Sequence, residues 1–276
     1  MSDDHVYLSL AETHDDSDAR WAFGTGFEDP LHGVDTTVPA GVDAARLAAD
    51  CLALGDDALV LAQRLAEWVT RAPELEEEVA LANIGLDLLG QTRLLYSRAG
   101  QADGTGRGED AYAYFRDSGA FRNVRLAELP DADFAHAIVR LLVFASWRLA
   151  HLTELSGAPD PVLAAIAAKG VRELTYHRQY AAEWAVRLGD GTDESRARTT
   201  AALTALAPYW EELFRAYDAR AAVLGDLRQV LDAAGLALPE PAALPGDGRA
   251  GDHTAHLAPL LTELQSVARA DPEATW

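Results

Sequence analysis

Apolar residues recur at helical spacing through most of the chain. The alternation of three- and four-residue steps predicts long helices over 44–72, 73–100, 130–157 and 160–191. Pro73 and Pro161 stand where a first helical turn tolerates proline. Gly100, Gly157 and Gly189 stand near the expected ends, where glycine favours the C-cap. Four helices of this length, joined by short loops, predict an antiparallel bundle.

The rest of the helical region is shorter and more interrupted. We expect a fifth helix over 193–224 with a kink at Pro208, a Pro/Gly-rich link over 235–252 and a last helix near 254–269. A break in the first helix is expected at Gly55, Asp56 and Asp57. No run of alternating β-branched residues predicts a strand. The fold class is therefore all-α.

Residues 1–44 lack a helical period and are rich in glycine, proline and acidic residues. Trp21, Phe23 and Phe27 lie within this stretch, and disordered segments are poor in aromatic residues. We interpret 1–44 as an irregular acidic arm that docks either on this bundle or on a partner. The alternative is a flexible acidic tail that docks on neither. The helical domain then covers 45–276.

Composition limits the functional classes. Hydrophobic residues make up 49% of the chain, enough for a large core, and the formal net charge is −21. Such acidity argues against nucleic acid and against an anionic membrane surface as partners. No stretch reaches the ~20 apolar residues of a membrane helix, and no secretory leader pattern opens the chain. We expect a cytoplasmic protein.

The helix expected around residues 80–96 is apolar almost all the way round, yet Asn83, Asp87 and Gln91 recur on it every four residues. An unpaired buried polar group costs ~1–3 kcal/mol, so this polar stripe needs partners. An arginine or lysine across the bundle is one candidate partner for Asp87. Lys169 is the only lysine of the sequence and is a second unusual feature.

Long helices of this kind suggest a di-iron carboxylate bundle, which requires glutamates and two Glu-x-x-His pairs. The sequence has no Glu-x-x-His. Asp133 precedes His136 by three residues, and His151 has Arg148 at that position, a cation where a metal would sit. Leu174 precedes His177 in the same way. His253-x-x-His256 is a weak metal motif without evident further ligands, and His177 alone is most simply a core histidine.

Four blocks of the sequence stand out, "GDDALVLAQRLAEW", "APELEEEVALANIGLDLLGQTRLLY", "YHRQYAAEWAVRLGDGTDES" and "HTAHLAPLLTELQ". Together they resemble the structural (C) subunits of phenylacetyl-CoA epoxidase, a bacterial multicomponent monooxygenase. The resemblance covers about residue 52 to Trp276. It implies a ferritin-like antiparallel helical bundle with extra C-terminal helices.

The resemblance also implies which positions correspond to iron ligands in the related catalytic subunit. Leu88 and Gln91 stand at one ligand pair and Leu174 and His177 at another, while Ala58 and Ala145 mark the two remaining positions less securely. We therefore expect no catalytic, cofactor-binding or metal-binding residue in this chain. In place of a metal site we expect a vestigial polar network, whose members are Asp87, Gln91, Lys169 and His177.

The implied function is a non-catalytic structural subunit that pairs with and stabilises the di-iron catalytic A subunit. The complex would use oxygen and NADPH to form the ring 1,2-epoxide of phenylacetyl-CoA, with a small B subunit and a reductase as further partners. One alternative is a di-metal oxidase in its own right, with Glu67, Glu78, Asp133 and Glu173 as ligands. A stand-alone helical interaction protein is the other. Stoichiometry, coenzyme A contacts and the face that meets the A subunit stay open.

Overall fold

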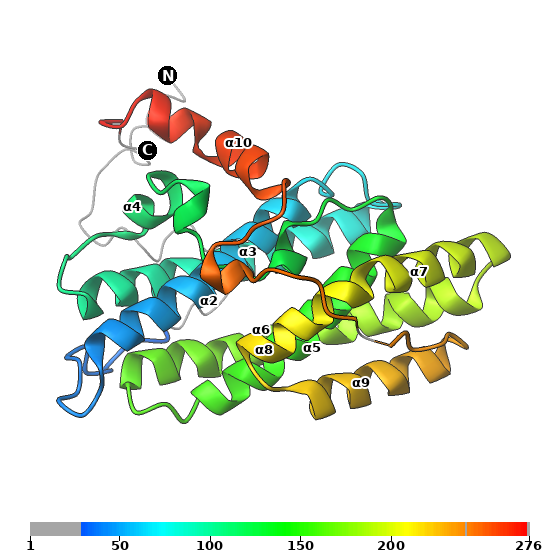
Figure 1. Cartoon of the computed structure of the whole chain (residues 1–276), viewed down its shortest axis with the longest axis horizontal. Helices are drawn as coiled ribbons and strands as arrows, with labels where there is room; N and C mark the ends of the chain where they lie inside the picture. Colours follow the sequence, from blue (N-terminus) through cyan, green and yellow to red (C-terminus); the bar gives the residue numbers. More distant parts are fainter. Residues whose placement is uncertain (1–28, 241, 275–276) are drawn as a thin grey trace, which may run out of the picture. The chain divides into compact units, whose positions relative to one another are not determined.

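The computed structural model describes residues 29–240 and 242–274 (Figure 1). The chain divides into two units, Met1–Gly33 and Val34–Trp276. In the first unit, residues 29–33 form a turn in which the His32 N–H donates to the Asp29 carbonyl. Trp21, Phe23 and Phe27 lie outside the described residues. All features below belong to the second unit.

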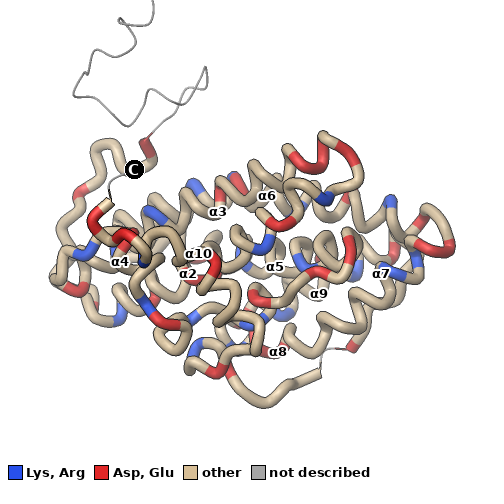
Figure 2. Tube along the Cα trace, turned by 90° about the horizontal axis from the view of Figure 1, so that it is seen from above, with Lys and Arg blue, Asp and Glu red and all other residues tan. Residues whose placement is uncertain are grey.

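Four long helices form the core of this unit: α2 (Ala44–Ala66), α3 (Leu75–Ala102), α5 (Phe134–Leu155) and α6 (Pro161–Asp190). Helix α2 packs along α3, α5 packs along α6, and α3 lies beside α6 (Figures 1 and 2). The described residues contain no strand. The predicted all-α helical bundle is therefore confirmed.

Side-chain caps explain where two of these helices begin. The Asp133 carboxylate accepts the His136 N–H at the start of α5, and the Asp160 carboxylate accepts the Leu163 N–H at the start of α6. Pro161 opens α6 as predicted. Both starts thus follow from local sequence.

The predicted end of α3 at Gly100 is wrong, because the helix continues to Ala102. Gly100 instead permits a close approach by the following loop. A Cβ added at this position would lie 2.1 Å from the Arg107 carbonyl oxygen, well inside van der Waals contact. The glycine serves tertiary packing here rather than helix termination.

The predicted break at Gly55, Asp56 and Asp57 is also wrong, because α2 is continuous. At Gly55 an added Cβ would lie 2.5 Å from the Tyr96 ring, so the glycine lets α3 approach. Both aspartates are fully buried. Asp56 accepts the Arg122 N–H at 2.7 Å, and Asp57 accepts the Val124 N–H at 2.8 Å.

The predicted kinked helix over 193–224 is three elements rather than one. Helix α7 (Asp193–Leu206) runs into a 3₁₀ turn, Ala207–Tyr209, that contains Pro208, and α8 (Trp210–Ala216) follows. Helix α9 (Arg220–Ala233) is separate and packs on α5 and α6. The kink expected at Pro208 is present as the 3₁₀ turn, but the single helix expected beyond it is wrong, because α8 ends at Ala216 and α9 begins at Arg220.

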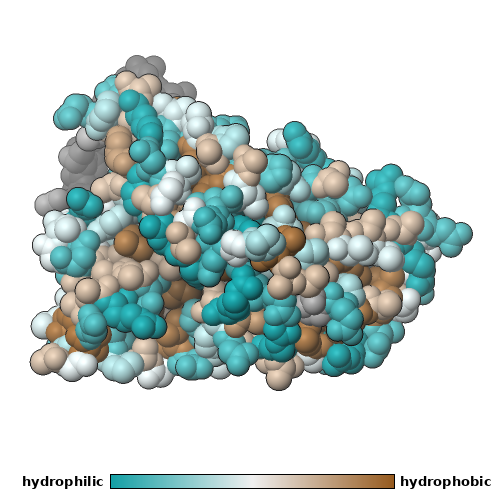
Figure 3. Space-filling view, viewed as in Figure 1, coloured by the Kyte–Doolittle hydropathy of each residue, from teal (hydrophilic) through white to brown (hydrophobic). Residues whose placement is uncertain are grey.

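The remaining helices are α4 (Glu109–Tyr114) and α10 (Leu257–Ala270), which contact each other. Helix α10 matches the predicted last helix. Across the described residues, no helix has both the length and the apolar character needed to cross a membrane. The view in Figure 3, over α8 and α9, shows hydrophobic residues in small groups separated by hydrophilic ones.

Buried ion pairs hold the irregular segments against the bundle. Arg249, in the link before α10, pairs with Asp57 of α2 at 2.6 Å. His253 pairs with Glu128 at 2.7 Å and also contacts the Phe121 carbonyl at 2.9 Å. These contacts place the link across α2 and the segment that precedes α5.

Candidate functional site

The centre of the bundle holds a buried arginine, Arg148 of α5, with no exposed surface. Its Nε donates to the Gln91 Oε1 at 3.0 Å, and its Nη1 donates to the Leu54 carbonyl at 3.1 Å. The Asp57 carboxylate lies 4.0 Å from Nη1. Three helices, α2, α3 and α5, therefore meet around one guanidinium group.

Gln91 also links Arg148 to α6 through hydrogen bonds. Its amide nitrogen donates to the Glu173 carboxylate at 2.9 Å, and the other oxygen of Glu173 pairs with the Lys169 ammonium group one turn away. Gln91 has no exposed surface, whereas Lys169 is partly exposed. Arg148, Gln91, Glu173 and Lys169 form a continuous polar chain, which we call the central network.

The polar stripe on α3 runs from solvent into the core. Asn83 is exposed, Asp87 is half-buried and Gln91 is fully buried. The Asp87 carboxylate lies 2.9 Å from the Nε2 of the fully buried His177. The expected arginine or lysine partner of Asp87 is thus replaced by a histidine, and Asp87 and His177 form a pair of their own beside the central network.

The other positions implied by the resemblance carry apolar side chains. None of the four has any exposed surface, and they are Ala58, Leu88, Ala145 and Leu174. Close packing continues at Gly170, where an added Cβ would lie 2.5 Å from Leu152 and 3.4 Å from the Gln91 side chain. The space around the central network is therefore filled by small and apolar groups.

The central network does not suit a di-iron centre. Iron of this kind needs several anionic oxygen ligands and histidines around it. Here the Glu173 carboxylate is already bound by Gln91 and Lys169, and the cationic Arg148 lies beside it. In the part of the chain that the structure describes, three ligand-type side chains converge at Glu74, Glu76 and Glu77, an acidic cluster at the start of α3 and not in the core.

The alternative ligand set of Glu67, Glu78, Asp133 and Glu173 does not come together as a metal-binding group in the described residues. Glu67 pairs with Arg64 at 2.7 Å, and Asp133 caps α5. Glu78 lies in the first turn of α3. In the His253-x-x-His256 motif, both ring nitrogens of His253 are engaged, one by the Glu128 carboxylate and the other by the Phe121 carbonyl.

Burial shifts the protonation of two residues near the network. Burial lowers the pKa of Arg148 to about 10, and the nearby Asp57 charge opposes that shift. The guanidinium therefore stays charged at neutral pH. Burial, together with the Arg148 charge, lowers the pKa of His151 to about 3, so this imidazole is neutral where it stacks on Tyr217 with ring centres 4.1 Å apart.

Sequence reasoning missed Arg148 and Glu173 as members of the network. The signal for Arg148 was present, because it stands three residues before His151 at a ligand-like position. The sequence does not show that the Arg148 side chain is fully buried, because its partners lie on other helices, α2 and α3. Glu173 is adjacent to Leu174, one residue away from the position that the resemblance implied.

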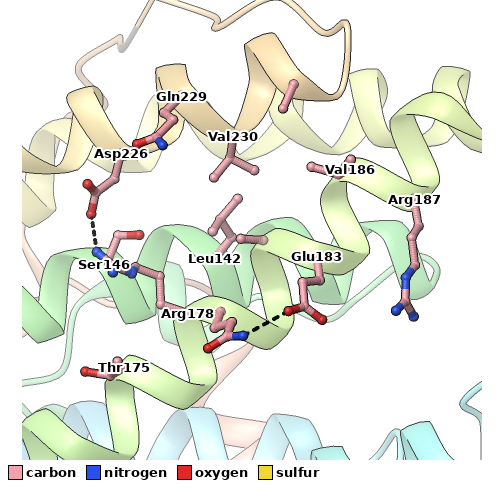
Figure 4. Close-up of a pocket in the computed structure, with 13 residues that line it drawn as sticks. Leu142, Ser146, Thr175, Arg178, Glu183, Val186, Arg187, Asp226, Gln229 and Val230 are labelled. Carbon is pink, nitrogen blue, oxygen red and sulfur yellow. Dashed lines mark hydrogen bonds and ion pairs between the residues drawn. The ribbon is translucent and has the colours of Figure 1, made fainter.

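An open groove of about 610 Å³ lies between α5, α6 and α9 (Figure 4). Leu142 and Val230 line its apolar part. The Arg178 guanidinium pairs with Asp226 at 2.7 Å, and Gln179 donates to a neighbouring carboxylate on α6. Because these polar groups are paired within the chain, the groove is a weaker candidate site than the central network.

Comparisons with known proteins agree with this architecture. Residues 34–276 match the model of a family described as "Phenylacetic acid catabolic protein". The chain is also 40% identical over 247 residues to the C subunit of the 1,2-phenylacetyl-CoA epoxidase of Escherichia coli (strain K12). That alignment covers 84% of this chain and 99% of the relative.

Proposed function

This chain belongs to the family of phenylacetic acid catabolic proteins, and we propose that it is the non-catalytic structural subunit of a phenylacetyl-CoA epoxidase. In this role it pairs with a di-iron catalytic A subunit and stabilises it. A small B subunit and an NADPH-dependent reductase complete the complex, which acts in the cytoplasm. The whole complex uses oxygen to convert the phenyl ring to a 1,2-epoxide.

One observation supports the non-catalytic role: a guanidinium that is charged at neutral pH lies in the bundle core beside the ligand-like positions. Arg148 binds Gln91 there, and Glu173 is neutralised by Lys169. A metal cation would be repelled by Arg148 and would find these oxygens already bound. We interpret the central network as the replacement of a metal site by a protein cation.

The competing functions receive less support. A di-metal oxidase would need the carboxylates of Glu67, Glu78, Asp133 and Glu173 to converge. Three of them, Glu67, Asp133 and Glu173, are held by different partners. A stand-alone interaction protein would not be expected to resemble one component of an epoxidase over almost the full length of that relative.

Co-expression with the catalytic subunit tests the proposal. The purified catalytic subunit should melt at a higher temperature, and turn over phenylacetyl-CoA faster with its reductase, when this chain is present. A catalytic subunit that is equally stable and equally active without this chain would refute the structural role. Epoxide formation by this chain and the reductase alone would instead support the oxidase alternative.

A further inference from the structure

Helix α3 carries a second apolar face that points away from its own bundle. The inner face is fully or almost fully buried and includes Leu81, Ile84, Leu88 and Leu95. On the outer face, spacings of four and three residues alternate along one line, and its members are Leu75, Val79, Ala82, Leu86, Leu89 and Arg93. We call this line the outer seam.

The apolar members of the outer seam are unusually open to solvent. Leu86 is 59% exposed and Val79 is 51% exposed, and Leu75 and Leu89 are also exposed. A helix that is apolar on all sides is normally buried on all sides. The chain itself buries only one of the two faces.

The spacing of the outer seam indicates which kind of partner segment can cover it. Alternating steps of three and four residues produce the narrow stripe by which one helix packs along another at a shallow angle. From Leu75 to Arg93 the seam extends for roughly 27 Å at 1.5 Å per residue. The seam therefore fits a long helix and not a loop or a small molecule.

Charge further restricts the occupant. Glu74, Glu76, Glu77 and Glu78 cluster at the N-terminal end of the seam. A covering helix must offer lysine or arginine at that end, because like charges would oppose docking. A second copy of this chain would bring another net charge of −21, which opposes self-association at low salt.

We infer that the outer seam of α3 is the surface on which the catalytic subunit docks. The occupant is a long helix of that subunit, with apolar residues at alternating steps of three and four and cationic residues opposite the Glu74–Glu78 cluster. This inference rests on the proposed function and adds the face and the chemistry of the contact. It also accounts for α3 being apolar almost all the way round.

The test uses arginine substitutions in the full chain. Val79→Arg and Leu86→Arg change the outer seam, and Val267→Arg places the same group on α10, at a residue that is 60% exposed and outside the seam. Affinity for the purified catalytic subunit is measured by titration, with circular dichroism to confirm folding. Both seam variants should bind at least about 30-fold more weakly, as expected for central interface anchors, and Val267→Arg should bind like the wild type.

The outcomes separate the two proposals. Wild-type chain that binds the catalytic subunit, with seam variants that bind equally well, would overturn the docking surface and leave the structural role intact. Wild-type chain that neither binds nor stabilises the catalytic subunit would overturn the structural role itself. Sedimentation of the chain alone adds a further check. Self-association lost in Leu86→Arg, with unchanged binding to the catalytic subunit, would assign the seam to a second copy and refute the inference.

Discussion

Replacing Arg148 with methionine removes the charge and the donors at the bundle centre while keeping an unbranched side chain. The substitution leaves the buried Gln91 Oε1 without its partner at 3.0 Å, a loss of ~1–3 kcal/mol. Leu54 lies within α2, where its carbonyl still accepts from the helix backbone. Asp57 keeps Arg249 at 2.6 Å. Because the guanidinium no longer has to be desolvated, part of the loss is offset, and we expect a net destabilisation of about 2 kcal/mol.

Urea unfolding of the chain measures this cost. Arg46→Met serves as the matched control, because Arg46 pairs with Asp50 on the surface and its loss should cost less than about 0.5 kcal/mol. The double variant Arg148→Met with Gln91→Leu removes both partners. We expect its cost to be at least about 1 kcal/mol below the sum of the single costs. An unchanged unfolding free energy for Arg148→Met, or strictly additive costs, would refute the account of the central network.

Two further perturbations test contacts around this centre. Lys169→Met leaves the Glu173 carboxylate partly uncompensated in a mostly buried position and should lower stability by about 1 kcal/mol in thermal melts, whereas an unchanged melting temperature would contradict a role in the network. Burial lowers the pKa of His253, but its hydrogen bond and charge pairing with Glu128 outweigh that effect and raise it above the ordinary 6.5. Because the folded pKa is the higher one, the stabilisation is full below pH 6.5 and is lost as the pH rises through the folded pKa. His253→Gln should therefore show a smaller fall in stability between about pH 6 and 9, and parallel profiles would count against this pairing.

Local sequence was enough to predict the four long helices of the core, but not to interpret every glycine and aspartate in them. Gly55, Asp56 and Asp57 together indicate a helix break when only near neighbours are considered. In the structure their partners come from elsewhere: Tyr96 packs on the glycine, and Arg249 binds Asp57 from the far end of the chain. Tertiary contacts across such sequence distances override the local preference.

The candidate site was predicted in part for a similar reason. The family resemblance placed Gln91 and His177 in the bundle interior, and both are fully buried. Arg148 was noted only as a cation where a metal would sit, since its depth depends on how α5 rotates against α2 and α3. The outer seam could not be predicted from the sequence. A helix that is apolar on two faces does not reveal which of them is buried in its own bundle and which is left exposed.

Iron content tests the central claim most directly. The chain, expressed alone with iron supplied and then purified, should contain far less than one iron per molecule, because Arg148 and Lys169 occupy the positions around Gln91 and Glu173. The complex with the catalytic subunit should contain iron that follows the catalytic subunit when the two are separated. Two irons per molecule of this chain alone would contradict the account and make the bundle core an oxygen-activating site.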